Sequence, residues 1–427
     1  MRDQPRLQLT LCGAMLVGAL VVSGCSRGVS FRFSSGGIST GGYRFDFQGE
    51  KATRNENGII EADVTSLVIE NRFGDVRVTA TENDAKWQWD LTCWADDPHV
   101  ATRFTEQVKL ETATESGRRS WRLILPEPPV DDLRGVKSDL TLFVPEAVRV
   151  ELINEHGETK VEGIALGTKA RCRHGKLELL NLEGELDAST EHGQLFAEDI
   201  PGGILSNRHG KISANHVNGD LQVTTAHGAL TLADVDGSVQ ATNAHGDISA
   251  TDIQGKLQAK NEHGAIAVAN IENRVELQAS HDPLSVENVI RDVHLRNRHG
   301  SVTVFNVSGK LDVQSSFGKI DLETWSDEIV CRNEHGKIRI IVKNRAFRVV
   351  RSETTFADME VQIPASASPT IEAGTEHGEV DSDFPVLRLN EDVDNFQGLD
   401  RSPARVTLRN RHGDIRIKKV STSADSK

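Results

Sequence analysis

Aromatic residues are scarce in this sequence of 427 residues, where they make up 5% and include a single tyrosine. A groove that stacks sugar rings on aromatic side chains is therefore poorly supplied. Cysteine is also rare, with five in the chain. Beyond Cys25 there are only Cys93, Cys172 and Cys331, and an odd number argues against a complete disulfide framework.

Positive charge is in deficit as well. The sequence has 49 Lys and Arg residues against 63 Asp and Glu, a net charge of −14. This balance argues against nucleic acid as a partner and suits an envelope protein. After residue 22 no apolar run is long enough to span a bilayer. No nucleophile motif, phosphate-binding loop or zinc-protease signature is present in the sequence.

The N-terminus has the order of an export signal: Arg2 and Arg6, an apolar stretch over residues 9–22, and then Cys25. Such a segment is removed and is not part of the fold. The tetrapeptide Val-Ser-Gly-Cys that ends at Cys25 resembles the lipobox of bacterial lipoproteins. This resemblance implies cleavage before Cys25 and a diacylated thiol, which would anchor the protein without a spanning helix. Ser26 in place of Asp implies the outer membrane of a Gram-negative cell. The alternative is a plain secretion signal.

Through the middle of the chain a histidine recurs every 18 residues and is almost always followed by glycine. Nine of the ten intervals are 18 residues and one is 17. A fixed period this short predicts an all-β parallel β-helix, or β-solenoid, in which each repeat is one coil stacked on the previous one. About ten regular coils at about 4.8 Å each give a rod of roughly 50 Å. The slots are His156, His174, His192, His209, His227, His245, His263, His281, His299, Phe317 and His335.

Each coil repeats one order of residues when its histidine is numbered zero. Glycine follows at +1 and often again at +10, and apolar residues lie at +3, +5, +8, +12 and +14. Alternation over +3/+5 and over +12/+14 predicts two short strands per coil, each with one buried face. Cys172 and Cys331 fall on the buried side, about nine coils or roughly 40 Å apart. We expect them to fill the core without bonding to each other.

Two other slots form polar columns. The slot two residues before the histidine is mostly Asn or Thr, and the +7 slot is mostly Asn or Asp. Stacked Asn and Asp side chains at corners favour hydrogen-bonded turns, with glycine supplying positive φ. Asp282 replaces the glycine after His281, and we expect it to adopt the same conformation. Calcium binding by Asp199, Asp234 and Asp252 is an alternative, but the Gly-Gly-x-Gly-x-Asp sequence of calcium-binding β-rolls is missing.

The flanks of the repeat lack its period. Residues 61–150 hold four of the five tryptophans, one coil-like segment with Phe73-Gly74 in the His-Gly slot, and a helix signal at Asp97-Pro98. An aromatic-rich cap is what an open strand edge needs. The predicted parts are a signal peptide (1–24), a Gly/Ser-rich tether (25–60), an N-terminal β-rich cap (61–150), the regular solenoid (151–345), longer C-terminal coils and cap (346–420), and a disordered tail (421–427).

Several motifs together resemble one known family. Strands ending in a Val-Pro or Ile-Pro step, such as LTLFVPEAVRVELINEHGETKVEGI, coils of the form NxHGxI, and the closing RVTLRNRHGDIRI are similar to the bacterial putative-adhesin family. The resemblance covers residues 61–420. It implies a β-solenoid domain of unknown function, often found on envelope proteins, and it carries no catalytic residues to transfer.

The histidine column has two interpretations. Imidazoles that recur every ~4.8 Å are close enough to share Zn²⁺ or Cu²⁺, so the ten histidines at 156, 174, 192, 209, 227, 245, 263, 281, 299 and 335 are candidate metal ligands. The other interpretation is a structural stack of rings at a turn, because Phe317 and Phe73 occupy the same slot and cannot bind metal. The sequence does not decide whether the rings point inward or outward.

The sequence therefore predicts a lipid-anchored envelope protein that is not an enzyme. We expect it to act as an adhesin or surface scaffold that binds a glycan or a protein and needs no cofactor. One alternative is a metal-binding envelope protein. The other is a polysaccharide-active β-helix enzyme, with acid and base drawn from carboxylates such as Glu155, Glu191, Glu262 and Glu334. The regular coils lack the long loops from which such enzymes form clefts, and alternation with Arg173, Arg208 and Arg298 favours a solvated charged face.

Overall fold

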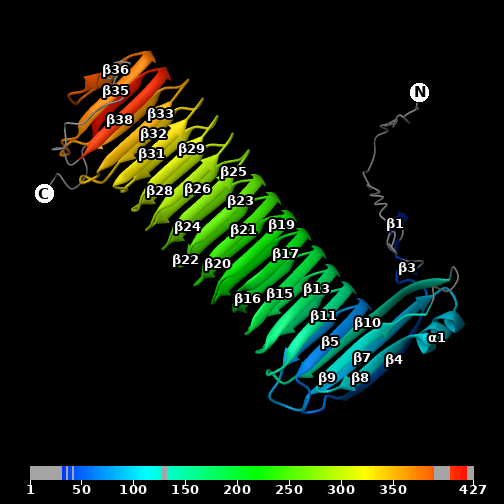
Figure 1. The fold of residues 1–427 in the computed structure, drawn as a ribbon. Helices are drawn as coiled ribbons and strands as arrows, with labels where there is room; N and C mark the ends of the chain where they lie inside the picture. The colour runs from blue at the N-terminus through cyan, green and yellow to red at the C-terminus, as the bar shows by residue number, and fades with distance from the viewer. Residues whose placement is uncertain (1–30, 35–36, 41–42, 127–131, 389–403, 421–427) are drawn as a thin grey trace, which may run out of the picture. The chain divides into compact units, whose positions relative to one another are not determined.

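A computed structural model describes residues 31–34, 37–40, 43–126, 132–388 and 404–420 (Figure 1). The predicted signal peptide, Cys25 and the predicted tail lie outside these residues. The chain divides into two compact units, and each is described by itself. The first contains residues up to 56, 89–111 and 123–139, and the second contains residues 57–88, 112–122 and 140 onwards.

The first unit contains an antiparallel sheet and a helix. The sheet is formed by β1 (Phe31–Ser34), β2 (Gly37–Thr40) and β3 (Tyr43–Phe45). The helix, α1 (Pro98–Gln107), begins where the Asp97-Pro98 step predicts. The Asp97 carboxylate accepts a hydrogen bond from the His99 backbone N–H at 2.7 Å, which caps the helix.

Strand β4 (Glu50–Ile59) lies in the segment predicted to be a tether. Its half-buried positions are Ala52, Arg54, Glu56 and Gly58, and two of them are charged. Arg54 forms an ion pair with Glu56 and lies over the Trp89 ring, 5.5 Å from the centroid. Hydrophobic alternation does not reveal a strand whose inward side chains are charged. The predicted tether covers residues 25–60, and the structure has strands within it at 31–34, 37–40, 43–45 and 50–59.

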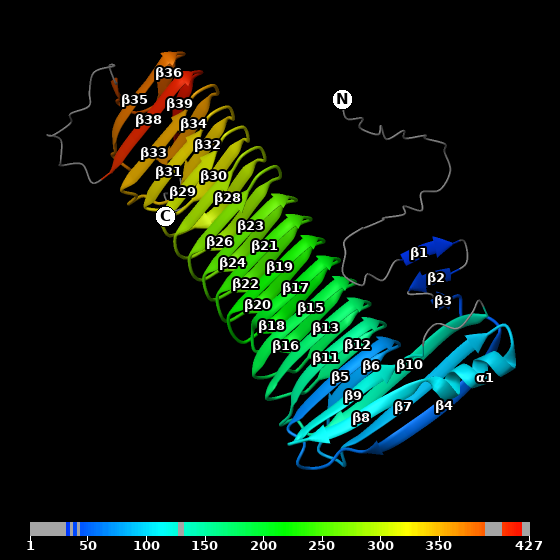
Figure 2. The same cartoon turned by 45° about the vertical axis from the view of Figure 1, so that its right-hand side comes forward.

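The second unit is a β-solenoid of about 12 turns, as the 18-residue period predicts. Each coil contributes one strand to each of two parallel sheets, and strands one coil apart pair in register, as His227 does with His245 (Figures 1 and 2). The sheet that ends on the histidines runs through β9 (Arg118–Ile124), β5 (Ser66–Phe73), β11 (Arg149–His156), β13 (Gly167–His174), β15 (Glu185–His192), β17 (Gly203–His209), β19 (Leu221–His227), β21 (Val239–His245), β23 (Leu257–His263), β25 (Val275–Ala279), β27 (Val293–Asn297), β29 (Leu311–Ser315), β31 (Glu328–Asn333), β33 (Val349–Thr354), β38 (Arg405–His412), β35 (Thr370–His377) and β37 (Leu387–Arg388).

The other sheet follows the same order of coils. It runs through residues 140–144 of β10 (Leu133–Val144), then β6 (Val76–Ala80), β12 (Thr159–Glu162), β14 (Leu177–Leu180), β16 (Leu195–Ile200), β18 (Ile212–Val217), β20 (Leu230–Val235), β22 (Ile248–Ile253), β24 (Ile266–Ile271), β26 (Leu284–Val289), β28 (Val302–Val307), β30 (Ile320–Thr324), β32 (Ile338–Val342), β34 (Met359–Pro364), β39 (Ile415–Val420) and β36 (Val380–Ser382). The N-terminal section also contains β7 (Lys86–Ala95) and β8 (Lys109–Glu115).

The core lies between the two sheets and is formed by the slots that the sequence predicts. In the coil of His245 the five apolar side chains are at most 4% exposed: Ile248, Ala250, Ile253, Leu257 and Ala259. Cys172 and Cys331 are also buried and unpaired, as expected. Burial raises the pKa of the Cys172 thiol to about 11 and that of Cys331 to about 12. Both thiols therefore stay protonated and act as small apolar side chains.

Chain order and spatial order differ at both ends of the solenoid. The early coil of β5 and β6 lies between β9 and β10 on one side and β11 and β12 on the other (Figure 2). At the far end, β38 and β39 lie between the β33–β34 coil and the β35–β36 coil. The segment predicted to be an isolated coil inside the N-terminal cap is thus part of the solenoid.

The two corners of each coil bend in different ways. At the +7 corner a non-glycine residue takes positive φ, between 50° and 59°, in Asn181, Asp199, His216, Asp234, Asp252, Asn270, Asn288 and Asn306. At the histidine corner the +1 glycine does so from Gly157 to Gly264. Asp282 does not take positive φ, which corrects the expectation for that slot. From this coil on the corner changes: β23 ends on His263, whereas β25 ends on Ala279, two residues before its histidine.

Candidate functional site

The predicted histidines form one continuous stack with the phenylalanines of the same slot, which we call the ring column. Neighbouring ring centroids lie 4.4 to 5.4 Å apart, and the planes are at most 32° from parallel. In spatial order the column contains Phe73, His156, His174, His192, His209, His227, His245, His263, His281, His299, Phe317, His335, Phe356, His412 and His377.

The rings of the column point outward, which the sequence leaves open. From His192 to His335 every ring is exposed, whereas Phe73 at the N-terminal end is buried. Stacked rings lie in parallel planes, so the lone pairs of neighbouring imidazoles run side by side and do not converge on one point. Among the described residues no group of three or more His, Cys, Asp or Glu side chains is arranged to hold a metal ion. The observed geometry is that of the structural stack.

Two histidines near the N-terminal end of the column have perturbed acidity. The pKa of His156 is lowered to about 4, mainly by burial and further by the positive charges of His174, Arg173 and Arg72. Burial also lowers the pKa of His174, with His192 acting in the same direction. Both effects disfavour the imidazolium form of these two half-buried rings.

Buried asparagines brace the corner beneath the rings. The Asn243 Nδ2 donates to the carbonyl of Gly246 in its own coil at 2.8 Å and to that of Gly228 in the preceding coil at 2.9 Å. Asn261 and Asn333 repeat the arrangement. Asn297 donates to the carbonyl of Gly300 in its own coil and to that of Asp282 in the preceding coil. Where threonine occupies the slot, as at Thr190 and Thr225, the buried hydroxyl has no hydrogen-bond partner in the described residues.

The +7 column is a corner support of the kind that its Asn and Asp residues predict. Asn270 donates to Asp252 at 2.9 Å, Asn288 to Asn270 at 3.0 Å, and Asn306 to Asn288 at 2.7 Å. Nearer the N-terminus, His216 lies between Asp199 and Asp234, the other two aspartates considered for calcium. Its Nδ1 is 4.0 Å from the Asp199 carboxylate and its Nε2 is 3.2 Å from that of Asp234. These contacts account for the column as a stack of side chains at a turn.

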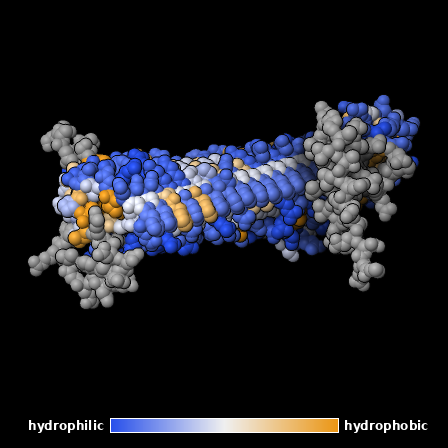
Figure 3. Space-filling model, turned by 90° about the horizontal axis from the view of Figure 1, so that it is seen from above, coloured by the Kyte–Doolittle hydropathy of each residue, from blue (hydrophilic) through white to orange (hydrophobic). Residues whose placement is uncertain are grey.

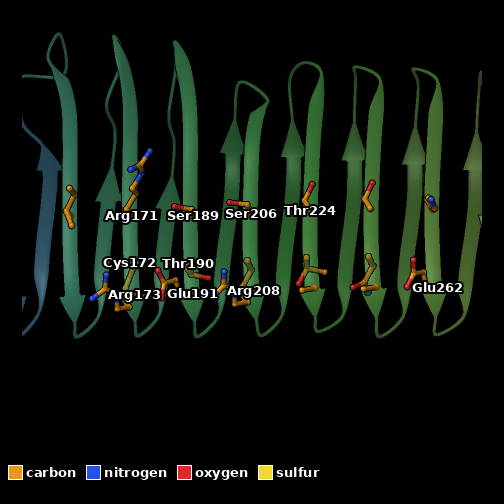
Figure 4. A pocket seen from close by; sticks show the side chains of 18 of the residues that line it. Arg171, Cys172, Arg173, Ser189, Thr190, Glu191, Ser206, Arg208, Thr224 and Glu262 are labelled. Carbon is orange, nitrogen blue, oxygen red and sulfur yellow. Dashed lines mark ion pairs between the residues drawn. The ribbon is translucent and has the colours of Figure 1, made fainter. Parts of the chain in front are cut away.

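A groove runs along the outer face of the histidine-side sheet, over β11 to β23, and we call it the axial groove. It encloses about 720 Å³. Its floor is formed by small side chains three residues before each histidine, Ser189, Ser206, Thr224 and Thr242. In the same slot, Arg171 and then Ile153 follow at one end and Lys260 at the other. Figure 4 shows Arg171, Ser189, Ser206 and Thr224 in one row and Arg173, Glu191, Arg208 and Glu262 in a second row nearer the ring column.

Ion pairs join the charged side chains of the second row at one end. Glu155 lies 3.3 Å from Arg72 and 3.9 Å from Arg173, and Arg173 lies 3.6 Å from Glu191. These carboxylates are occupied by arginines, so they are not a free acid and base pair. Within the described part of the chain, Arg171, Arg208 and Lys260 have no carboxylate partner. Sequence reasoning missed this groove, although a run of Ser and Thr in one slot was its visible signal.

Exposed hydrophobic side chains gather toward the C-terminal end of the solenoid, as Figure 3 shows, while most of the visible face is hydrophilic. The exposed large hydrophobic residues of the C-terminal coils, on any face, include Ile290, Phe305, Phe317, Trp325 and Phe356. Phe317 and Phe356 belong to the ring column, so their exposure follows from the position of the column on the surface.

The stacked coils and the repeated corner fit a known domain, whose family model, Toastrack DUF4097, matches residues 64–366. The chain belongs to the Toastrack DUF4097 family. This match confirms the resemblance drawn from the motifs and the all-β solenoid fold. Toastrack DUF4097 is a domain of unknown function, so the family assigns no catalytic or binding residue to these coils. The sequence has no significant match among curated proteins.

Solved structures similar to this Toastrack chain share little sequence with it. A putative cell adhesion protein from Clostridium sporogenes is 11% identical, covering 86% of this chain and 100% of that one, with a TM-score of 0.17. A putative adhesin from Parabacteroides merdae is 12% identical, covering 62% and 96%, with a TM-score of 0.21. A putative adhesin from Bacteroides fragilis is 11% identical, covering 64% and 96%, with a TM-score of 0.21.

Proposed function

We propose that the mature protein is a lipid-anchored component of the bacterial cell envelope, at the outer membrane. It acts without catalysis, as an adhesin or surface scaffold that presents the outer face of its solenoid to a partner. The observation that carries this proposal is the uninterrupted stack of coils with the axial groove, about 720 Å³ in volume, along the outer face of one sheet. A regular sheet of this kind supports extended contact with a long ligand and encloses no small substrate.

Membrane attachment in this proposal rests on the lipobox-like sequence at Cys25, which lies outside the described residues. Among the helices of the described residues none is long and apolar enough to cross a membrane. Two acyl chains on Cys25 would supply stable attachment, since one chain alone binds weakly and reversibly.

The test of anchoring compares Cys25→Ser with Cys12→Ser, a matched control in the segment before the cleavage site. We expect Cys25→Ser to move the protein from the membrane fraction to the soluble fraction and Cys12→Ser to leave it in the membrane. Labelling with an alkyne fatty acid reports acylation directly. Equal membrane retention and labelling of both variants would overturn the lipid anchor.

The test of the non-catalytic role is incubation of the full chain with alginate, pectin and peptidoglycan fragments, followed by chromatography of the products. We expect no shortening of any of these glycans. Turnover that disappears in Glu191→Gln or Glu262→Gln would overturn the proposal and establish the polysaccharide-active alternative. A substitution at Glu379, an exposed carboxylate outside the groove, is the matched control.

A further inference from the structure

We propose that the axial groove binds an anionic linear polysaccharide, such as a uronic acid polymer, with the glycan chain lying along the solenoid axis. Arg171 and Arg208 contact its carboxylates, and the hydroxyls between them contact its sugar hydroxyls. This inference rests on the proposed function as a non-catalytic binding protein, because it names the ligand class of the same face.

The charge of the groove is opposite to that of the protein. Its lining contains four cations, Arg171, Arg173, Arg208 and Lys260, and three carboxylates, Glu155, Glu191 and Glu262. The difference is +1 for the groove, while the whole chain carries −14. Glu155 and Glu191 are paired with Arg173 and Arg72, so the remaining charged side chains of the lining are Arg171, Arg208 and Lys260 against the single carboxylate of Glu262. Arg171 and Arg208, several coils away from Glu262, can therefore bind an added anion.

Arginine is well suited to this ligand, because its planar guanidinium donates two parallel hydrogen bonds to a carboxylate. Arg171 and Arg208 project from strands β13 and β17, which are separated by one intervening strand, β15. A ligand that contacts both must therefore cross at least three successive coils. Carboxylates repeated along one polymer chain can meet both guanidinium groups at once, so this spacing favours a chain that runs along the axis over a small single anion.

The floor of the groove repeats with the coils. Ser189, Ser206 and Thr224 occupy equivalent positions on consecutive paired strands, and Thr242 continues the row. Hydroxyl groups therefore recur at about 4.8 Å, the spacing of hydrogen-bonded strands. An extended polysaccharide advances by a comparable distance per sugar ring, so each ring meets one hydroxyl that both donates and accepts.

The same lining disfavours other linear polymers. None of the residues that line the axial groove is aromatic. Proteins that bind single-stranded nucleic acid stack its bases on aromatic side chains, and grooves for neutral sugars use the same stacking. A groove without aromatic side chains holds its ligand by charge and hydrogen bonds, which fits a polymer that has both carboxylates and hydroxyls.

The experiment measures binding of the full chain, solubilised in detergent, to sodium polygalacturonate and sodium alginate by biolayer interferometry. Neutral dextran and single-stranded DNA of matched length are the comparison ligands. We expect the acidic glycans to bind, with affinity that falls as salt is raised, and dextran to show no binding. The double variant Arg171→Gln/Arg208→Gln should bind at least about tenfold more weakly.

Arg291→Gln is the matched control, because Arg291 is exposed, has no carboxylate partner in the described residues and lies outside the groove. All variants are checked for an unchanged unfolding midpoint. Absence of binding to both acidic glycans, tighter binding of DNA, or equal loss in Arg291→Gln would overturn the inference. Each of these results leaves membrane anchoring by Cys25 intact, whereas glycan shortening during the measurement would instead overturn the non-catalytic function.

Discussion

The imidazole of His412 stacks on the ring of Phe356, with centroids 5.2 Å apart and planes 4° from parallel. His377 precedes His412 in the sequence but stacks on its opposite face, at 4.7 Å. The coil of β38 and β39 therefore lies between the β33–β34 coil and the β35–β36 coil and is paired on both sides. This arrangement protects the chain end from fraying, because β38 and β39 cannot leave without separating from two neighbours.

Truncation before this coil should destabilise the whole C-terminal end. A chain that ends at residue 404 lacks β38 and β39, so strand edges of β33, β34, β35 and β36 lose their partners. We expect a lower unfolding temperature and concentration-dependent association, because unpaired edges pair with other chains. Analytical ultracentrifugation and a thermal scan measure both effects. A chain ending at residue 420 is the control, and a monomer with unchanged stability after truncation at 404 would contradict the interleaved end.

We expect the asparagines beneath the ring column to contribute more to the stability of the solenoid than the threonines in the same slot. Asn243→Ala removes two hydrogen bonds to glycine carbonyls and should lower the free energy of unfolding by about 1–3 kcal/mol. Thr225→Val replaces a buried hydroxyl that has no partner in the described residues, so stability should be unchanged or higher. Urea unfolding monitored by circular dichroism compares the two. A larger loss in Thr225→Val than in Asn243→Ala would refute this account of the corner.

Acid should weaken the N-terminal end of the column through His156. Its pKa in the folded protein is lowered from 6.5 to about 4, so the folded state binds fewer protons than the unfolded state between these values. The stability contributed by the neutral ring is complete above pH 6.5 and is lost as the pH falls toward 4. We expect His156→Phe, which keeps a stacking ring, to show a smaller loss of stability between pH 7 and pH 4.5. Equal losses in both proteins would show that His156 does not titrate as expected.

Replacement of central histidines by phenylalanine tests whether the column is structural. Phe317 already stacks between His299 and His335 at 5.0 and 4.8 Å, so the triple variant His227→Phe/His245→Phe/His263→Phe should keep its fold and unfolding temperature. Elemental analysis after dialysis against trace Zn²⁺ and Cu²⁺ should give no stoichiometric metal in either protein, since stacked imidazoles do not converge on one ion. Several equivalents that are lost in the variant would establish the metal-binding alternative.

Much of the solenoid could be predicted because the residues that repeat every 18 positions have strong local conformational preferences. Ile248 and Ala250 alternate with polar residues, which predicts a half-buried strand, and Asp252 in the next slot tolerates the positive φ of the corner. The axial groove could not be predicted in the same way. It depends on Ser189, Ser206 and Thr224 lying side by side, and small polar residues are common on any exposed strand.

The sequence by itself determined the all-β class, the coil of two strands, the inward residues and the stacking of one histidine slot upon the next. These features follow from local periodicity, because each coil contacts only its neighbours. Only the tertiary structure decided the order of coils at the two ends, the presence of strand β4 and the outward direction of the rings. It also decided the ion pairs of Glu155 and Glu191 with Arg72 and Arg173, which leave Arg171 and Arg208 without a carboxylate partner in the described residues. Those depend on contacts between residues far apart in the chain, such as Phe73 with His156, and no local pattern of hydrophobicity encodes them.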